Sequence, residues 1–272
     1  MSCLRLGLDA VSWMRFSVGR IALLSAIVLG LASAGPALAQ ELPRDPPAEN
    51  DLAVMGTIPL YWGERSDMAE LLDGGAPGHW ARPLIEQSWR LRPLDYLSAE
   101  ALSGYSRLLL AQPRGFSAEE NVALDAWVRG GGRVLLFADP MMTGHSRFAI
   151  GDRRRPQDVT LLSPILTHWG LELQFDEAQP EGRNMRDSVP PSKELSLPVE
   201  LAGELVLRAP AQDCALLGAG IAAECELGDG FALVVADAAL FDGEQPGEGA
   251  SGALEALLGH VYGNRVPPPA PR

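Results

Sequence analysis

The sequence predicts an α/β fold built on a mostly parallel sheet. Residues 108–111 and 134–138 are unbroken apolar runs, the pattern of strands that are buried on both faces. More than a dozen residues separate the two runs, as the crossover between parallel strands requires. A helical pattern fills this gap, so residues 107–140 predict a complete strand, helix, strand unit.

The helix of this unit is marked at both ends. Ser117 can cap its N-terminus, and Glu120, three residues later, completes a capping box. Three successive glycines at 130–132 end the helix and lead into a strand. Phosphate-binding loops precede a helix N-terminus, so we interpret these glycines as a C-cap and a tight turn.

Elements before this unit are shorter. Residues 53–62 predict a first core strand whose end opens at Gly56, Thr57 and Pro59, and residues 83–89 predict a short helix. Residues 90–94 predict a second strand, placed at the edge of the sheet because Pro93 cannot donate to a ladder. Ser98 is the expected cap of a helical turn over residues 99–102.

The second half alternates long loops with strands. Residues 141–158 are polar and predict a loop, residues 161–169 a helix and residues 171–175 a strand. Residues 177–195 have no periodicity and predict a second long loop. A β-rich part follows, with expected strands at 204–207, 215–217, 221–227 and 231–236. Residues 228–230 form its last hairpin turn, and a closing helix spans residues 250–262.

The ends of the chain predict export. Arg15 and Arg20 precede an apolar run at 21–34, and small residues at 37–39 suit signal peptidase, so residues 1–39 are expected to be a signal peptide. Residues 1–13 are interpreted as a start-site extension. The expected location is periplasmic or secreted, with an uncleaved N-terminal membrane anchor as the alternative. Residues 40–50 are expected to be a flexible lead, 51–264 a single α/β domain and 265–272 a proline-rich disordered tail.

The net charge and the cysteine content limit which ligands the chain is expected to bind. The net charge of −13 disfavours binding to nucleic acid. Cys214 and Cys225 are an even pair in a compartment where disulfides form, and they can be either bridged or two buried thiols. Two cysteines without a nearby histidine do not make a zinc site, so we expect neither a metal nor a cofactor.

A binding surface is expected where the strands end. Open α/β sheets bind ligands outside the carboxyl ends of their strands, and polar or flexible side chains follow several predicted strands here. The residues assigned to this surface are Trp62, Gln112, Arg114, Asp139, Met142 and Asp237.

Three segments together carry a family resemblance. Residues 107–140, 161–173 and 228–241 resemble the periplasmic domains of GldG-type auxiliary components of ABC-type transport systems. The resemblance implies a three-layer, flavodoxin-like domain with a class I glutamine-amidotransferase-like fold, helices on both faces of the sheet and a β-rich C-terminal part. An intraflagellar-transport domain shares that fold. The resemblance also implies a role outside the cytoplasm as an accessory to a membrane complex.

The sequence lacks the residues of the related enzymes. Amidotransferases place a cysteine on a strained elbow after a strand, whereas Ala138, Asp139 and Pro140 stand at that point here. We therefore predict no catalytic residues and no enzymatic activity. Three strand-end carboxylates, Asp139, Asp237 and Asp242, leave open a secreted hydrolase acting on glycans.

The favoured function is a non-enzymatic accessory or binding domain in the cell envelope. Its expected partner is a membrane or envelope protein, such as a transporter permease, or a small ligand. The alternatives are the glycan-active hydrolase and a structural subunit that docks on a permease.

Overall fold

The computed structural model describes residues 47–64, 78–189, 195–208 and 213–263, all within the unit Pro46–Arg272. The expected signal peptide (1–39), most of the expected lead (40–46) and the expected tail (265–272) lie outside these residues. Among the described helices, none has the length and apolar character needed to cross a bilayer.

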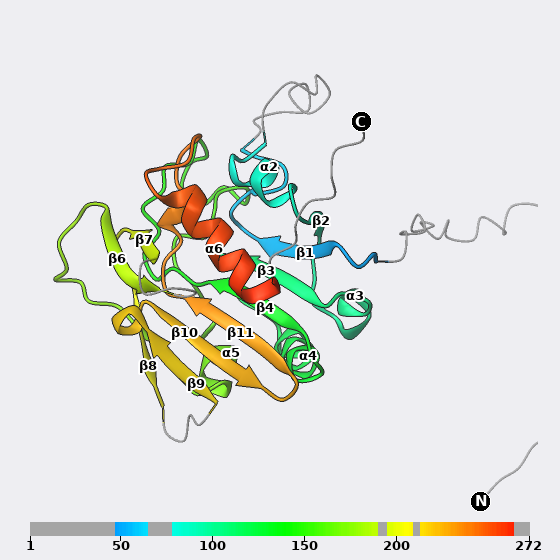
Figure 1. The fold of residues 1–272 in the computed structure, drawn as a ribbon. Coiled ribbons are helices and arrows are strands. Elements are labelled where there is room, and N and C mark those ends of the chain that lie inside the picture. The colour runs from blue at the N-terminus through cyan, green and yellow to red at the C-terminus, as the bar shows by residue number, and fades with distance from the viewer. Residues whose placement is uncertain (1–46, 65–77, 190–194, 209–212, 264–272) are drawn as a thin grey trace, which may run out of the picture. The chain divides into compact units, whose positions relative to one another are not determined.

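A seven-stranded sheet forms the centre of the fold (Figure 1). Its first five strands are parallel to one another, and each of the last two pairs antiparallel with the strand before it, so the predicted mostly parallel α/β sheet is confirmed. In spatial order the strands are β2 (Arg90–Pro93), β1 (Asp51–Gly56), β3 (Arg107–Ala111), β4 (Arg133–Phe137), β11 (Gly230–Val235), β10 (Ala222–Leu227) and β9 (Cys214–Leu217). The predicted edge position of the Pro93 strand is also confirmed.

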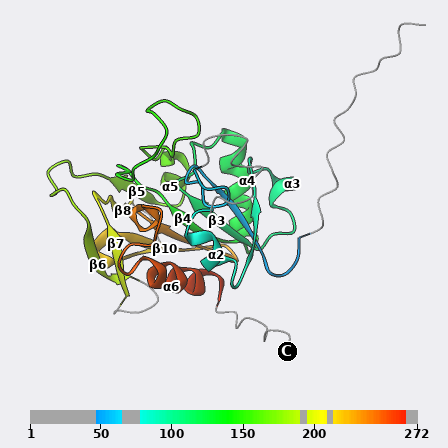
Figure 2. The ribbon, with the colours of Figure 1, turned by 90° about the horizontal axis from the view of Figure 1, so that it is seen from above.

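Helices cover both faces of this sheet (Figure 2). On one face lie α2 (Ala81–Ile85) and α6 (Ala250–Tyr262), and on the other lie α3 (Ala99–Leu102), α4 (Ala118–Arg129) and α5 (Ser163–His168). Tyr262 fixes α6 to the sheet, because its buried hydroxyl donates to the Leu108 carbonyl at 2.5 Å and accepts from the Leu135 N–H at 3.2 Å. The predicted closing helix is therefore part of the core.

The predicted strand, helix, strand unit is present as β3, α4 and β4. Both halves of the capping box form: Ser117 Oγ accepts from Glu120 N at 3.2 Å, and the Glu120 carboxylate accepts from Ser117 N at 2.9 Å. Gly132 follows the helix, where an added Cβ would lie 2.5 Å from the Trp127 ring. Close packing therefore requires a glycine at this position, in agreement with the interpretation of residues 130–132 as a C-cap and a tight turn.

The N-terminal elements differ from their predicted bounds. β1 begins at Asp51, two residues before the predicted start, and ends at Gly56, the first of the residues at which the strand was expected to open. An added Cβ at Gly56 would lie 2.0 Å from the Ala111 carbonyl oxygen, which shows how closely the chain approaches β3 before turning away. Residues 47–50, assigned to the lead, include a turn in which Ala48 N donates to Asp51 Oδ2 at 3.0 Å.

The second predicted loop, residues 177–195, is also corrected. It contains β6 (Asn184–Val189), which pairs antiparallel with β7 (Leu195–Val199). A separate pair joins β5 (Leu171–Gln174) to β8 (Glu204–Leu207). The sequence did not indicate β6, because its residues are mostly polar and lack the alternation of a half-buried strand. Its pairing with β7 is also irregular between Arg186 and Val189.

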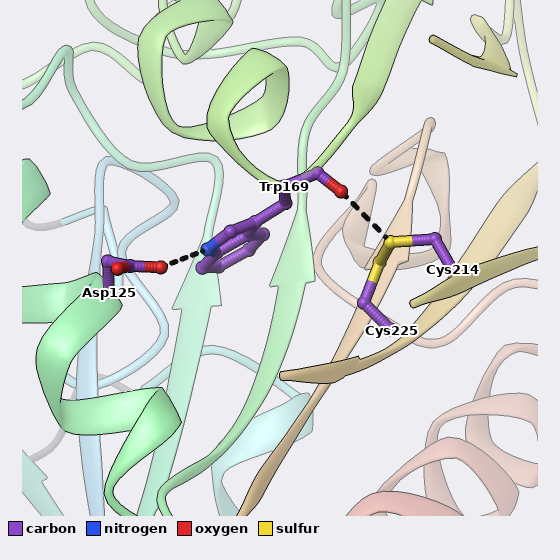
Figure 3. The surroundings of a disulfide bond; sticks show 4 residues. All are labelled: Asp125, Trp169, Cys214 and Cys225. Carbon is purple, nitrogen blue, oxygen red and sulfur yellow. Dashed lines mark hydrogen bonds between the residues drawn. A yellow bond between two sulfur atoms is a disulfide. The ribbon is translucent and has the colours of Figure 1, made fainter. Parts of the chain in front are cut away.

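A disulfide joins Cys214 in β9 to Cys225 in β10 (Figure 3). The two residues are direct partners in the antiparallel ladder, with Cα atoms 4.0 Å apart. The structure thus selects one of the two arrangements that the sequence left open. Trp169 lies beside the bridge: its carbonyl oxygen is 3.2 Å from Cys214 Sγ, and its indole N–H donates to Asp125 Oδ1 in α4 at 3.0 Å.

Candidate functional site

The carboxyl ends of the central strands are joined by side chain to backbone hydrogen bonds. Gln112 follows β3, and its amide binds both backbone groups of Asp139, which follows β4. Gln112 Nε2 donates to the Asp139 carbonyl at 2.9 Å, and Gln112 Oε1 accepts from Asp139 N at 2.8 Å. The same Nε2 donates to the Gln157 carbonyl at 3.0 Å, which ties in the loop after β4. Gln112 is completely buried and serves as a brace between strand ends.

Two aspartates continue this brace across the sheet. Asp139 accepts from Met141 N at 2.7 Å and from Ala238 N, after β11, at 2.9 Å. Asp237 accepts from Ala239 N at 2.7 Å and from Glu200 N, after β7, at 2.9 Å. Each residue is only 1% exposed. All four carboxylate oxygens therefore bind backbone amides, and solvent does not reach them.

Burial shifts the protonation of the strand-end aspartates, Asp139, Asp237 and Asp242. It raises the pKa of Asp139 to about 7 and the pKa of Asp237 well above its ordinary value, and the neighbouring aspartate charges add to both shifts. Burial raises the pKa of Asp242 to about 6, although Arg183, 3.3 Å from its Oδ2, opposes the shift. These three carboxyl groups sense one another's charge, so they lie in one electrostatic cluster.

A cavity of about 700 Å³, here called the strand-end pocket, lies over the same edge of the sheet. The segments that follow β1, β4 and β11 line it, together with residues 78–80. Its acidic side chains are Glu64, Asp242 and Glu244. The loop after β4 closes against this wall, because Glu64 Oε2 accepts from Arg147 N at 2.9 Å.

Aromatic rings form another wall of the pocket. His79 lies 5.6 Å from Trp80 and 6.0 Å from Phe241 between ring centroids, and Phe241 packs on Phe137 beneath. Both His79 nitrogens are occupied: Nδ1 accepts from Ala81 N at 3.2 Å, so Nε2 carries the proton and donates to the Phe241 carbonyl at 2.9 Å. Burial lowers the pKa of His79, which favours this neutral form. His79 therefore lines the pocket as a neutral ring with both nitrogens engaged.

The structure divides the residues that the sequence assigned to one surface. Met142 lines the pocket, whereas Gln112, Asp139 and Asp237 are buried in the brace. Trp62 is 57% exposed and packs on Tyr61, and Arg114 binds Glu120 at 2.7 Å beside α4. Neither Trp62 nor Arg114 lines the pocket, so the six residues do not form one surface. The aromatic wall was missed because His79 and Trp80 precede a helix instead of following a strand.

The strained corner lies one strand earlier than predicted. Gln112, after β3, has φ +47°, whereas Ala138, Asp139 and Pro140 all have ordinary negative φ. A strained residue after a strand is the geometry that exposes a nucleophile in related enzymes, but Gln112 is a buried amide. Within the described ranges, no cluster of three or more histidine, cysteine or acidic side chains is arranged to hold a metal ion.

Comparisons with known proteins address the family and the fold. No curated protein matches the chain. The N-terminal domain of mmIFT52 is 13% identical over 79% of this chain and 99% of that domain, and its TM-score of 0.52 shows a shared fold. A putative ThuA-like protein from Bacteroides uniformis is 10% identical over 81% of this chain and 97% of its own, with a TM-score of 0.41. A β-galactosidase from Rahnella sp. R3 reaches a TM-score of 0.45 at 14% identity over 80% of this chain, which spans 32% of that enzyme.

A family model described as an ABC-type uncharacterized transport system matches residues 72–190, from the segment before α2 to the end of β6. The predicted resemblance is confirmed at this level, without its GldG-type detail. The match covers less than half of the chain, so it shows a similarity to auxiliary components of ABC-type transport systems over residues 72–190.

Proposed function

We propose that this protein is a non-enzymatic accessory of an ABC-type transport system, exported to the cell envelope, where it binds a transporter component or a small ligand. The family match over residues 72–190 is the observation that carries the proposal. The signal-like pattern of residues 1–39 supports export to the periplasm or secretion, with retention as an N-terminal anchor as the variant.

The finer fold assignment belongs to this proposal. Five parallel strands between helical layers, with a left-handed residue after β3, suit a flavodoxin-like, class I glutamine-amidotransferase-like scaffold. The position after β3 carries the buried Gln112 amide instead of a thiol. The scaffold is therefore that of an enzyme, with its strained corner used as a brace between strands.

The state of the carboxylates supports a non-enzymatic role. Glycoside hydrolysis needs an acid and a base or nucleophile that both reach the sugar. Asp139 and Asp237 are 1% exposed and bind four backbone amides between them, so they lack access to a substrate. Of the three strand-end aspartates, Asp242 alone then lines the pocket, where it is paired with Arg183.

Co-purification from the native host tests the accessory role. We expect a C-terminally tagged copy, expressed from its own locus, to be found in the envelope fraction and to retain the transporter permease and ATPase after mild detergent extraction. A tagged, unrelated exported protein is the control. Recovery of the tagged chain in the cytosol, or without any transporter component, would show that the proposal is wrong.

A surface substitution locates the contact. Trp62 is 57% exposed and directly precedes Gly63 and Glu64, which line the strand-end pocket. Large aromatic side chains commonly dominate protein interfaces. We expect Trp62→Ala to reduce recovery of the permease. Val122→Ala, at a residue 70% exposed on α4, is the matched control and should leave recovery unchanged. Equal recovery from both variants would exclude Trp62 from the contact.

A further inference from the structure

We propose that the strand-end pocket binds a small organic cation, meaning an ammonium group carried on an apolar body. This inference deepens the proposed function, because it rests on the chain being a binding component and names the chemistry of its ligand.

The size and position of the pocket suit a small molecule. Its volume of about 700 Å³ falls within the range of about 300–1,000 Å³ that is typical of small-molecule sites. It lies beyond the carboxyl ends of β1, β4 and β11, where open α/β sheets place their ligands. The pocket therefore has both the volume and the location of a ligand site, independently of its charge.

The ionisable side chains of the lining favour a positive ligand. Glu64, Asp242 and Glu244 contribute three carboxylates, against one guanidinium, that of Arg147, and the two imidazoles of His79 and His145. Arg183 compensates part of the Asp242 charge from outside the lining. The net charge of −13 for the whole chain adds a long-range attraction for cations.

The aromatic wall selects an organic cation over a hydrated metal ion. Trp80, Phe241 and the neutral His79 ring line the pocket, and the negative faces of aromatic rings attract ammonium groups. Met142 adds an adaptable apolar surface that suits the body of such a ligand. Rings with carboxylates beside them are the combination that suits an alkylammonium or arylalkylammonium ligand.

Calorimetric titration with matched probes tests the charge preference. Choline is compared with its uncharged tert-butyl analogue, and benzylamine with benzyl alcohol, so each pair differs mainly in charge. We expect the cation of at least one pair to bind about tenfold more tightly than its neutral partner, with the difference shrinking at high salt. If neither cation binds more tightly than its neutral partner, the inference is wrong.

Conservative variants tie the preference to this pocket. We expect Glu244→Gln and Glu64→Gln each to weaken cation binding about threefold and to leave the neutral probes unchanged. Gln at position 64 keeps an acceptor for Arg147 N, so the loop contact is preserved. Glu226→Gln in β10 and Asp229→Asn in the β10–β11 turn are exposed, charge-matched controls away from the lining. Equal losses in the controls would overturn the assignment.

The binding experiment can fail without contradicting the proposed function, and the reverse also holds. If the probes fail while the transporter still co-purifies, the ligand inference alone is wrong. If cations bind to the purified chain but no transporter component is recovered, the accessory role is wrong and the pocket assignment stands.

Discussion

At the end of β3, Gln112 holds a left-handed backbone, with φ +47°, that costs a non-glycine residue about 1–3 kcal/mol. Its side chain offsets this strain by making three hydrogen bonds to buried backbone groups of two other segments. Gln112 therefore carries both the backbone strain and the side-chain hydrogen bonds that offset it. Replacing its side chain removes the hydrogen bonds, and the choice of replacement decides whether the backbone strain remains.

We expect Gln112→Ala to lower the free energy of unfolding by about 2–4 kcal/mol, because it leaves Asp139 N and its carbonyl unpaired while keeping the strain. Gln112→Gly loses the same bonds but relieves the backbone, so it should be about 1 kcal/mol more stable than Gln112→Ala. Urea denaturation of both variants measures the difference. An alanine variant as stable as the glycine variant would mean that the left-handed backbone stores no strain.

Gly56 lies in a tightly packed strand, whereas Gly252 faces open space on a helix. A Cβ at Gly56 would lie 2.0 Å from the Ala111 carbonyl oxygen, whereas one at Gly252 in α6 would meet no heavy atom within 4 Å beyond its chain neighbours and the backbone of its own helix. We expect Gly56→Ala to destabilise the protein by about 2–3 kcal/mol through overpacking of β1 on β3. Gly252→Ala should stabilise it by about 0.5–1 kcal/mol through helix propensity. Thermal unfolding of the two variants checks these opposite signs, and equal signs would contradict the packing described for β1.

The disulfide holds the edge strand β9 to β10, and it closes a short loop with a sequence separation of 11. By loop entropy, we expect Cys214→Ala combined with Cys225→Ala to lower the free energy of unfolding by about 2–3 kcal/mol. Hydrogen exchange should accelerate first in β9 and in Trp169, whose carbonyl contacts Cys214. Reduced wild-type protein provides the control, since it should behave like the double variant. Unchanged exchange in β9 after reduction would refute a stabilising role for the bridge.

Elements whose signals are local were predictable from the sequence. Ser117 and Glu120 specify the start of α4, and Pro93 specifies the edge position of β2, because each acts through its own backbone or its near neighbours. β6 was not predictable, since its polar residues become a strand only by pairing with β7. Gly56 marks the end of β1 in the sequence, whereas the close approach of Ala111 that leaves no room for a side chain there is a property of the folded sheet.

The candidate site was less predictable than the fold. Topology brings Gln112, Asp139 and Asp237 to one edge, as expected, but hydrogen bonding to backbone amides turns them inward. The pocket wall comes from His79 and Trp80, which are far along the chain from Phe241 and which no motif marks. Which strand-end residue faces a cavity and which braces the sheet is decided by contacts between segments.

At the scale of the whole molecule, buried acids and a buried histidine set opposing pH dependences. The pKa of Asp139 is raised to about 7, that of Asp242 to about 6 and that of Asp237 above its ordinary value. The native chain then holds more protons than the unfolded chain above about pH 4, so this stability is complete at low pH and is lost as the pH rises through 6 to 7. The lowered pKa of His79 acts oppositely, with stability lost as the pH falls below about 6.5.

Three acids against one histidine predict a net loss of stability between about pH 5 and pH 8. Urea unfolding across this range should show a falling midpoint, steepest below about pH 6, where these acids are ionised in the unfolded chain but Asp242 and Asp139 still hold protons in the native chain, and flattening as the two ionise between about pH 6 and pH 7. The charges around Asp242 are those of Arg183, Glu200 and the other two aspartates, so Asp242→Asn should reduce the fall below about pH 6. The exposed Asp229→Asn should keep it. A midpoint that rises steadily from pH 5 to pH 8 would show that the strand-end aspartates are ionised in the native chain throughout, held charged by the backbone amides that they accept.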